Sequence, residues 1–124
     1  QVNFTFKAPE HPIYVEINPA LHSWTIENLV KNAIDAMKGK GSLNIIISEL
    51  EDIVKISITD SGKGIPKNQF TKVFEPGFTT KKRGWGLGLS LTKRIVQEYH
   101  KGKIKVAHSE IGKGTTMQIS YKTA

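Results

Sequence analysis

Hydrophobic and polar residues follow two periods along the 124-residue chain, and each period predicts its own kind of element. Alternation with a period of two, or short runs rich in Ile and Val, is typical of strands. A connection of two residues, Glu51-Asp52, predicts a hairpin between two of these strands. Strands are predicted over Val2–Lys7, Ile13–Ile17, Leu43–Leu50, Ile53–Thr59, Lys103–Ala107 and Thr115–Tyr121.

Apolar residues at helical spacing predict a first helix from about Pro19 to Lys38. Asn18 before Pro19 is typical of an N-cap followed by proline at the first helical position. A short helix is expected within Pro66–Phe74, and a last helix over Gly88–His100. The residues expected to face the core are Ile26, Leu29, Val30, Ala33 and Met37 of the first helix, Phe70, Val73 and Phe74 of the second, and Leu91, Ile95, Val96 and Tyr99 (or Leu87) of the last.

This order of elements is neither all-parallel nor doubly wound. It predicts an α/β (α+β) two-layer sandwich, in which a mixed, mainly antiparallel sheet of about five strands or more packs on three helices. The length fits one domain over residues 1–124. Because the chain opens at Gln1, we expect it to be a fragment of a longer protein.

The composition, with 38% hydrophobic and 23% charged residues, is that of a globular domain. The absence of cysteine excludes disulfides and thiolate–metal sites and suits a reducing cytosol. No apolar run is long enough to span a bilayer. The net charge is +7, but lysine and arginine are scattered along the sequence and mostly predict a solvated surface. The run Lys81-Lys82-Arg83 better fits a small polyanion.

A row of polar residues lies on the first predicted helix, opposite its apolar stripe. Asn28, Asn32 and Asp35 are spaced at i, i+4 and i+7. Asparagine is a weak helix former, so its repeated use here suggests a function, although an ordinary polar face is the alternative. An amide oxygen is a hard ligand that suits Mg²⁺. Asn32 is the candidate ligand, and Asn28 supports it from one turn earlier.

Two glycine-rich segments carry the remaining candidate chemistry. Asp60, at a strand end, can accept a hydrogen bond from an exocyclic amine such as that of adenine, and the glycines after it leave room for a flat ring; an ordinary turn is the alternative. Gly84, Gly86 and Gly88 alternate directly into a helix, where backbone N–H groups could bind phosphate oxygens. A flexible surface loop is the alternative there. The sequence has no P-loop, and its four histidines lack metal-ligand spacing.

Five segments in this order resemble the ATP-binding catalytic domain of bacterial sensor histidine kinases, which belongs to the superfamily of gyrase, mismatch-repair and heat-shock chaperone ATPases (the Bergerat fold). The resemblance covers nearly the whole chain, from about Phe4 to Tyr121. The segments are Glu27–Ala36 (N box), Asp60–Ile65 (first glycine box), Phe70–Lys81 (F box and lid), Gly84–Leu89 (second glycine box) and Gly112–Thr115 (last box).

The resemblance implies ATP and Mg²⁺ as cofactors and a flexible ATP lid. Asn32 would hold Mg²⁺, and Asn28 would support the phosphates and act in catalysis. Asp60 would bind the adenine amino group, and Lys81 on the lid would reach the γ-phosphate as a second catalytic residue. The implied cofactor-binding set is Asn28, Asn32, Asp60, Gly62, Gly64, Ile65, Lys81, Gly84, Gly86, Leu87, Gly88, Leu89 and Thr115.

Asn28 distinguishes subfamilies, because hydrolytic members carry a glutamate at this position to activate water. A neutral amide cannot act as a general base. Glu27 is adjacent in sequence but about 100° round the helix. The sequence therefore predicts poor intrinsic ATP hydrolysis.

The resemblance also implies a phosphoacceptor outside this chain. Sensor kinases phosphorylate a histidine usually followed by an acidic residue, and none of His11, His22, His100 and His108 is followed by one. We therefore expect transfer to a histidine-bearing dimerisation domain of the same parent protein, with a response regulator downstream. A cytoplasmic location, no nucleic-acid partner and no membrane segment in this chain are expected. A Ser-directed kinase of the anti-sigma-factor type and a non-catalytic protein-binding module are the alternatives.

Overall fold

The computed structural model describes residues 1–77 and 88–124, and these form two layers. One layer is a five-stranded sheet of order β1-β2-β3-β5-β4. β1 runs parallel to β2, and the other neighbours are antiparallel. The strands are β1 (Val2–Lys7), β2 (Gly41–Leu50), β3 (Ile53–Asp60), β4 (Lys103–Glu110) and β5 (Gly114–Lys122). The predicted mixed, mainly antiparallel sheet is confirmed.

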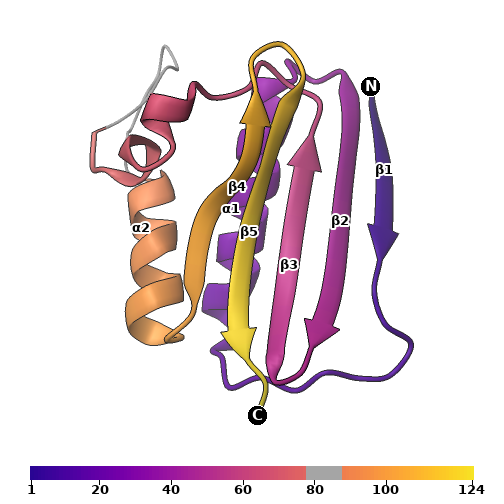
Figure 1. The fold of residues 1–124 in the computed structure, drawn as a ribbon, viewed down its shortest axis with the longest axis vertical. Helices are drawn as coiled ribbons and strands as arrows, with labels where there is room; N and C mark the ends of the chain where they lie inside the picture. Colours follow the sequence, from indigo (N-terminus) through magenta and orange to yellow (C-terminus); the bar gives the residue numbers. More distant parts are fainter. Residues whose placement is uncertain (78–87) are drawn as a thin grey trace.

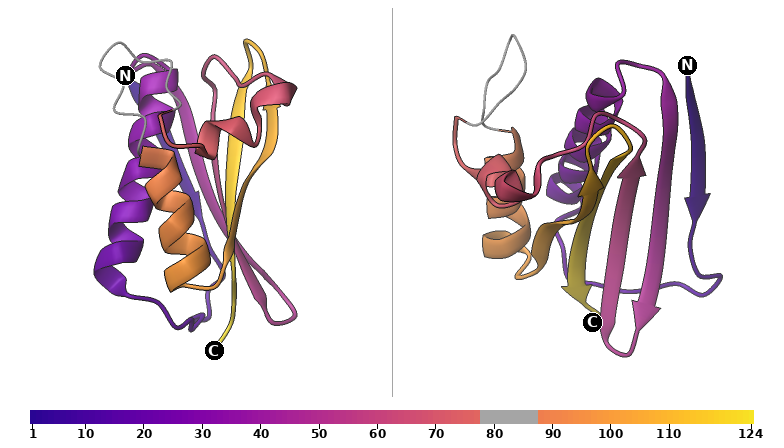
Figure 2. Two further views of the ribbon diagram at one scale, coloured as in Figure 1. Left: turned by 90° about the vertical axis from the view of Figure 1, so that its left-hand side faces the viewer. Right: turned by 45° about the horizontal axis from the view of Figure 1, so that its top comes forward.

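The other layer is helical and lies on one side of the sheet (Figures 1 and 2). α1 (Pro19–Ala36) begins at Asn18, whose side chain accepts a hydrogen bond of 3.0 Å from the Leu21 amide. α2 (Gly88–Arg94) continues into a π-helical turn, η3 (Ile95–Tyr99). Two 3₁₀ turns, η1 (Lys67–Gln69) and η2 (Lys72–Phe74), lie beside the start of α2 in Figure 1. The two-layer class is therefore confirmed.

The core lies between these layers. It is built from the buried face of α1, the helix-side residues of the strands, and two residues of η2. Its members include Leu29, Ala33, Leu43, Ile58, Val73, Phe74, Val96 and Ile119. The strands alternate buried and accessible residues, as in the β3 run from Ile53 to Asp60. The alternation leaves the other side of the sheet mostly polar, with exposed Ile46 and Leu50 among its residues. The helices do not cover this side (Figure 1).

The predicted strand Ile13–Ile17 is wrong, because this segment has no regular secondary structure. It crosses the lower end of the sheet on its way from β1 to α1 (Figure 1), where no strand edge is available for pairing. Its alternation instead reflects packing, since Ile13, Val15 and Ile17 are half-buried against the core.

The predicted strand Val2–Lys7 is confirmed, but its apolar residues are largely exposed. Phe4 pairs with Leu43 of β2 and therefore lies on the helix side, yet 58% of it is accessible. Phe6 is similarly exposed. β1 is the outermost strand, whereas α1 crosses behind the middle of the sheet (Figure 1), so the helix does not cover this edge.

Two helix predictions need correction. The segment 66–74 forms the separate turns η1 and η2 instead of one helix, and neither has a capping side-chain hydrogen bond; its aromatic residues do turn inward. In the last helix, Leu91 and Tyr99 are exposed, whereas Thr92 is fully buried. The π turn takes more residues per turn than an α-helix, and this rotates Tyr99 out of the expected apolar stripe.

Candidate nucleotide-binding site

The candidate residues that the structure describes gather at one end of the sheet. Asp60 is the last residue of β3 and pairs with Thr115 at the start of β5. α1 passes behind these strands, and α2 begins beside them (Figure 1). Lys81, Gly84, Gly86, Leu87 and most of the expected lid lie outside the described residues.

Asp60 is a buried carboxylate held by backbone amides. Its Oδ1 accepts a hydrogen bond of 2.8 Å from Gly62 and one of 3.3 Å from Thr115. Burial raises the pKa of Asp60, and the two hydrogen bonds partly offset that rise. Within residues 1–77 and 88–124, Oδ2 has no hydrogen-bond partner. The carboxylate is therefore fixed in place with one oxygen available as an acceptor.

The glycines after Asp60 are required by the packing of the protein itself. A Cβ on Gly62 would lie 2.7 Å from the Ala36 carbonyl oxygen at the end of α1. A Cβ on Gly64, whose φ is +83°, would lie 2.3 Å from the Glu110 carbonyl oxygen. The segment thus passes between α1 and the β4–β5 turn with no room for a side chain at either glycine. Packing within the domain therefore accounts for glycine at both positions.

Ser109 on β4 is a site residue that the sequence reasoning missed. Its hydroxyl accepts a hydrogen bond of 2.7 Å from the Ile65 amide and lies 3.0 Å from the Gly114 carbonyl oxygen. It is also 2.7 Å from the Thr115 hydroxyl. Ser109 therefore joins the segment after Asp60 to the start of β5. This role depends on the pairing of Ser109 with Thr115 across β4 and β5, which the sequence does not show.

Asn28 is tied to α2 by a second missed residue, Thr92. The Thr92 hydroxyl donates to the Gly88 carbonyl oxygen at 2.7 Å. Having used its only proton there, it accepts from the Asn28 side-chain amide at 2.9 Å. The Asn28 amide packs against Gly88, with Oδ1 at 3.1 Å and Nδ2 at 3.2 Å from where a Cβ on that glycine would be. A small residue at position 88 leaves room for this amide.

The other candidates extend the site along α1. Asn32 is half-buried one turn after Asn28, and Ala36, one turn later, contacts the segment after Asp60. With a rise of about 1.5 Å per residue, Asn28 and Ala36 are separated by about 12 Å along the helix axis. Leu89 and Ile65 are half-buried against the core, and Asp35 is exposed. Residues 1–77 and 88–124 contain no group of three His, Cys, Asp or Glu side chains that could hold a metal ion.

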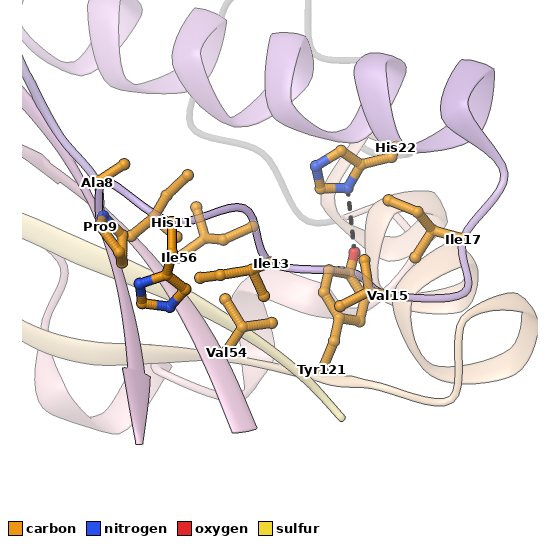
Figure 3. Close-up of a pocket in the computed structure, with 11 residues that line it drawn as sticks. Ala8, Pro9, His11, Ile13, Val15, Ile17, His22, Val54, Ile56 and Tyr121 are labelled. Carbon is orange, nitrogen blue, oxygen red and sulfur yellow. Dashed lines mark hydrogen bonds between the residues drawn. The ribbon is translucent and has the colours of Figure 1, made fainter. Parts of the chain in front are cut away.

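A separate apolar pocket of about 250 Å³ lies at the opposite end of the sheet, beneath the segment 8–17 (Figure 3). At one end of it, His22 Nδ1 and the Tyr121 hydroxyl are 3.4 Å apart. Nearby, His100 Nε2 accepts a 3.0 Å hydrogen bond from the Asn18 amide. In this cluster, burial lowers the pKa of both histidines, and for His22 the nearby His100 lowers it further. Burial raises the pKa of the Tyr121 hydroxyl to about 12. This cluster is structural and distant from Asp60.

Residues 20–124 match the family model described as "Histidine kinase-, DNA gyrase B-, and HSP90-like ATPase". The chain belongs to this ATPase family, and membership in it implies that the domain binds ATP. Among curated proteins it is 40% identical over 119 residues to the sensor histidine kinase ZraS of Escherichia coli K12, an alignment that covers 96% of this chain. It is 44% identical over 95 residues, 76% of this chain, to sporulation kinase A of Bacillus subtilis.

Solved structures agree with this placement. The catalytic domain of the histidine kinase ThkA superposes with a TM-score of 0.86 at 31% identity, covering 98% of this chain and 78% of that one. The mycobacterial sensor histidine kinase MprB gives 0.87 at 25% identity, covering 98% and 82%. The chain spans only 25% of ZraS and 15% of sporulation kinase A. No helix in the described parts is long and apolar enough to cross a membrane.

Proposed function

We propose that this domain binds Mg²⁺-ATP and donates the γ-phosphoryl group to a histidine on a separate dimerisation domain of its parent protein, as part of two-component signalling. The nearest support for the histidine target is the similarity to sensor histidine kinases and sporulation kinases. A ThkA structure in complex with the response regulator TrrA, which matches at 29% identity, supports a response regulator as the next recipient. A cytoplasmic location belongs to the same proposal.

The observation that carries ATP recognition is the arrangement of Asp60. Because Gly62 and Thr115 both donate to Oδ1, the free Oδ2 is an acceptor fixed by the fold. The exocyclic amine of adenine is a donor, whereas guanine presents a carbonyl oxygen in the corresponding position. Because Oδ2 is held in place, guanine would set its carbonyl oxygen against this acceptor and leave both oxygens without a donor. The arrangement therefore selects adenine over guanine.

The residues along α1 fit the triphosphate end of the nucleotide. Amide oxygens are hard ligands, and Mg²⁺ takes most of its remaining ligands from phosphates and water, so no carboxylate cluster is needed. Asn32 is the proposed ligand, and Asn28, held by Thr92, presents its oxygen beside Gly88. Bound Mg²⁺ would neutralise charge on the phosphates. The proposed roles of Lys81 and of the second glycine box complete this end of the site.

Calorimetric titration of ATP and GTP into the domain tests the nucleotide site. Asp60→Asn keeps an oxygen for the two backbone amides but replaces the free acceptor with a donor. Losing a hydrogen bond to a charged group costs about 1.5–3 kcal/mol, so ATP affinity should fall about 10- to 100-fold. Asp52→Asn, in the exposed β2–β3 turn, is the matched control and should bind ATP as the unmodified domain does. Equal affinity for ATP and GTP in the unmodified domain would contradict the role given to Asp60.

The role of Asn32 needs a separate titration. Asn32→Ala should remove most of the gain in ATP affinity that Mg²⁺ produces, while leaving Mg²⁺-free binding nearly unchanged. Phosphoryl transfer is then tested by supplying the histidine-bearing domain of the parent protein with labelled ATP. Label on that domain, lost when its histidine is replaced, would support the kinase proposal. Label on a serine instead would overturn the histidine assignment while preserving ATP binding.

A further inference from the structure

The side of the sheet away from the helices, here called the open face, carries mainly positive charge. The strand register places five exposed lysines on it: Lys7, Lys55, Lys103, Lys105 and Lys122. Among the described strand positions of this face, Glu110 at the end of β4 is the only acidic residue, and it pairs with Lys113 at 3.4 Å. Lysines that look scattered in the sequence are therefore gathered by the fold on one surface.

Cross-strand rows show how these lysines are spread. One row runs across the whole sheet from Lys7 through Ile46, Ser57 and Gln118 to Lys105. With strands about 4.8 Å apart, its two lysines are about 19 Å from each other. In the next row, Lys55 and Lys103 lie on either side of Ser120, about 10 Å apart. The positive charges thus cover the face rather than forming one compact cluster.

None of the five lysines takes part in an ion pair with another residue of the described ranges. The ion pairs there involve other residues, such as Arg94 with Glu98 and Lys113 with Glu110. The small polar residues of the face instead bond to each other, as Thr59 does with Thr116 at 2.8 Å and Gln118 with Ser57 at 3.3 Å. The ammonium groups of the five lysines are therefore available to an external partner.

The chemistry of the face decides which anionic partner it fits. It has no arginine, phenylalanine, tyrosine or tryptophan at any strand position, and His108 is its only aromatic ring. Protein interfaces rely on buried aromatic and arginine anchors, and sheets that bind single-stranded nucleic acid stack bases on aromatic side chains. Lysine is a point charge on a flexible stem. A partner with laterally mobile anionic groups in a plane can adjust to charges spread in this way.

We propose that the open face docks on an anionic lipid bilayer surface. Ile46 and Leu50, both exposed on this face, would contact the headgroup region between the lysines. Glu51 and Asp52 lie in the β2–β3 turn at the lower edge, where repulsion from anionic lipid opposes tip-first insertion and favours the sheet lying flat. The helical layer, with Asn28 and Asn32, then faces away from the lipid and keeps the nucleotide site accessible.

Co-sedimentation with vesicles tests this proposal. The probes are vesicles of neutral phosphatidylcholine alone and of the same lipid with about 30% phosphatidylserine. The face variant is Lys55→Gln/Lys103→Gln/Lys105→Gln. The matched control is Lys38→Gln/Lys40→Gln/Lys67→Gln, which changes three exposed lysines off the face. Each variant loses three charges, so the net charge falls from +7 to +4 in both.

We expect binding to the anionic vesicles only, weakened by salt. Each lysine near such a surface contributes about a fivefold gain in affinity, so the face variant should bind about 100-fold more weakly. The control should change about twofold or less, because its charges lie away from the lipid plane. ATP binding should be unchanged in both variants, which separates this test from that of the nucleotide site.

Three outcomes would overturn the proposal. Equal losses in the two variants would show that net charge, and not the open face, causes the binding. Absence of vesicle binding at low salt would remove the lipid surface as a partner. A face variant that binds vesicles normally but loses affinity for duplex DNA, or for an acidic protein, would assign the face to that partner instead.

Discussion

The side-chain amide of Asn28 on α1 donates a hydrogen bond of 2.9 Å to the hydroxyl of Thr92 on α2. Because the Thr92 proton is used by the Gly88 carbonyl, the orientation of the Asn28 amide is fixed with its nitrogen toward Thr92. One buried threonine thus couples the position of α2, which follows the expected lid, to a proposed phosphate-binding residue.

Thr92→Val should test this coupling, since valine has nearly the same shape but no hydroxyl. The substitution leaves the Asn28 amide and the Gly88 carbonyl without this partner, so we expect a loss of about 1–3 kcal/mol in the free energy of unfolding. ATP affinity should also fall, because Asn28 is free to rotate. Urea denaturation and calorimetry measure the two effects. Thr92→Ser keeps the hydroxyl and should retain most of the ATP affinity; an equal loss of affinity in both variants would contradict the coupling.

Poor ATP hydrolysis is the second prediction. A positioned general base contributes about 10²- to 10⁴-fold to a rate, and Asn28 cannot supply that contribution. Steady-state phosphate release by the unmodified domain should therefore be slow, and Asn28→Glu should raise it. The same variant should be less stable, because a carboxylate cannot donate to Thr92. Glu27→Gln, which changes the exposed neighbouring carboxylate, should leave turnover unchanged. Rapid hydrolysis by the unmodified domain would refute this prediction.

Alanine substitutions at Gly64 and Gly112 test whether close packing requires glycine beside the site. Both have positive φ, +83° and +81°, but a Cβ on Gly112 would contact nothing within 4 Å. Gly112→Ala should cost about 1 kcal/mol from backbone strain alone. Gly64→Ala should cost about 3 kcal/mol or more, since the added carbon would overlap the Glu110 carbonyl. Chemical denaturation measures both losses, and equal losses would show that the close packing is not the cause.

Stability should depend on pH through His22 and His100. Because burial lowers the pKa of both histidines below the ordinary value of 6.5, the unfolded chain binds more protons than the folded domain in the range below 6.5. Stability must therefore fall as the pH decreases through that range and recover as it rises. Asp60 acts in the opposite direction at more acidic pH, because its pKa is raised.

Thermal denaturation from pH 7.5 down to about pH 5 measures this dependence. We expect the midpoint to fall over the interval and the slope to be shallower in His22→Gln. His108 is exposed on β4, and His108→Gln is the control that should keep the slope of the unmodified domain. A slope unchanged in His22→Gln would show that the cluster around Tyr121 does not cause the pH dependence.

Much of the fold could be predicted because local patterns and long-range packing agree. Apolar spacing in α1 and alternation in β3 and β5 describe faces that are buried in the structure. The prediction failed where local pattern and surroundings differ. Ile13–Ile17 alternates like a strand but has no strand beside it, and Phe4 is apolar but lies beyond the cover of α1.

The same division holds for the site. Asp60, Asn28 and Asn32 are recognisable because their side-chain chemistry and their order along the chain form a pattern within the sequence. Thr92 and Ser109 are not, because each acts through a partner that is distant in sequence: Asn28 is 64 positions from Thr92, and Ile65 is 44 from Ser109. A hydroxyl gains such a role only when packing brings its partners within hydrogen-bond distance.

The sequence by itself therefore determined the class of domain and the order of most of its elements, and it predicted the side chains that would act on ATP, since these depend on residue type and spacing. Only the tertiary structure decided which oxygen of Asp60 is free, which glycines are required by packing, and that five separate lysines share one face. Those properties depend on which distant segments pair, because strand register, and not position along the chain, places residues side by side.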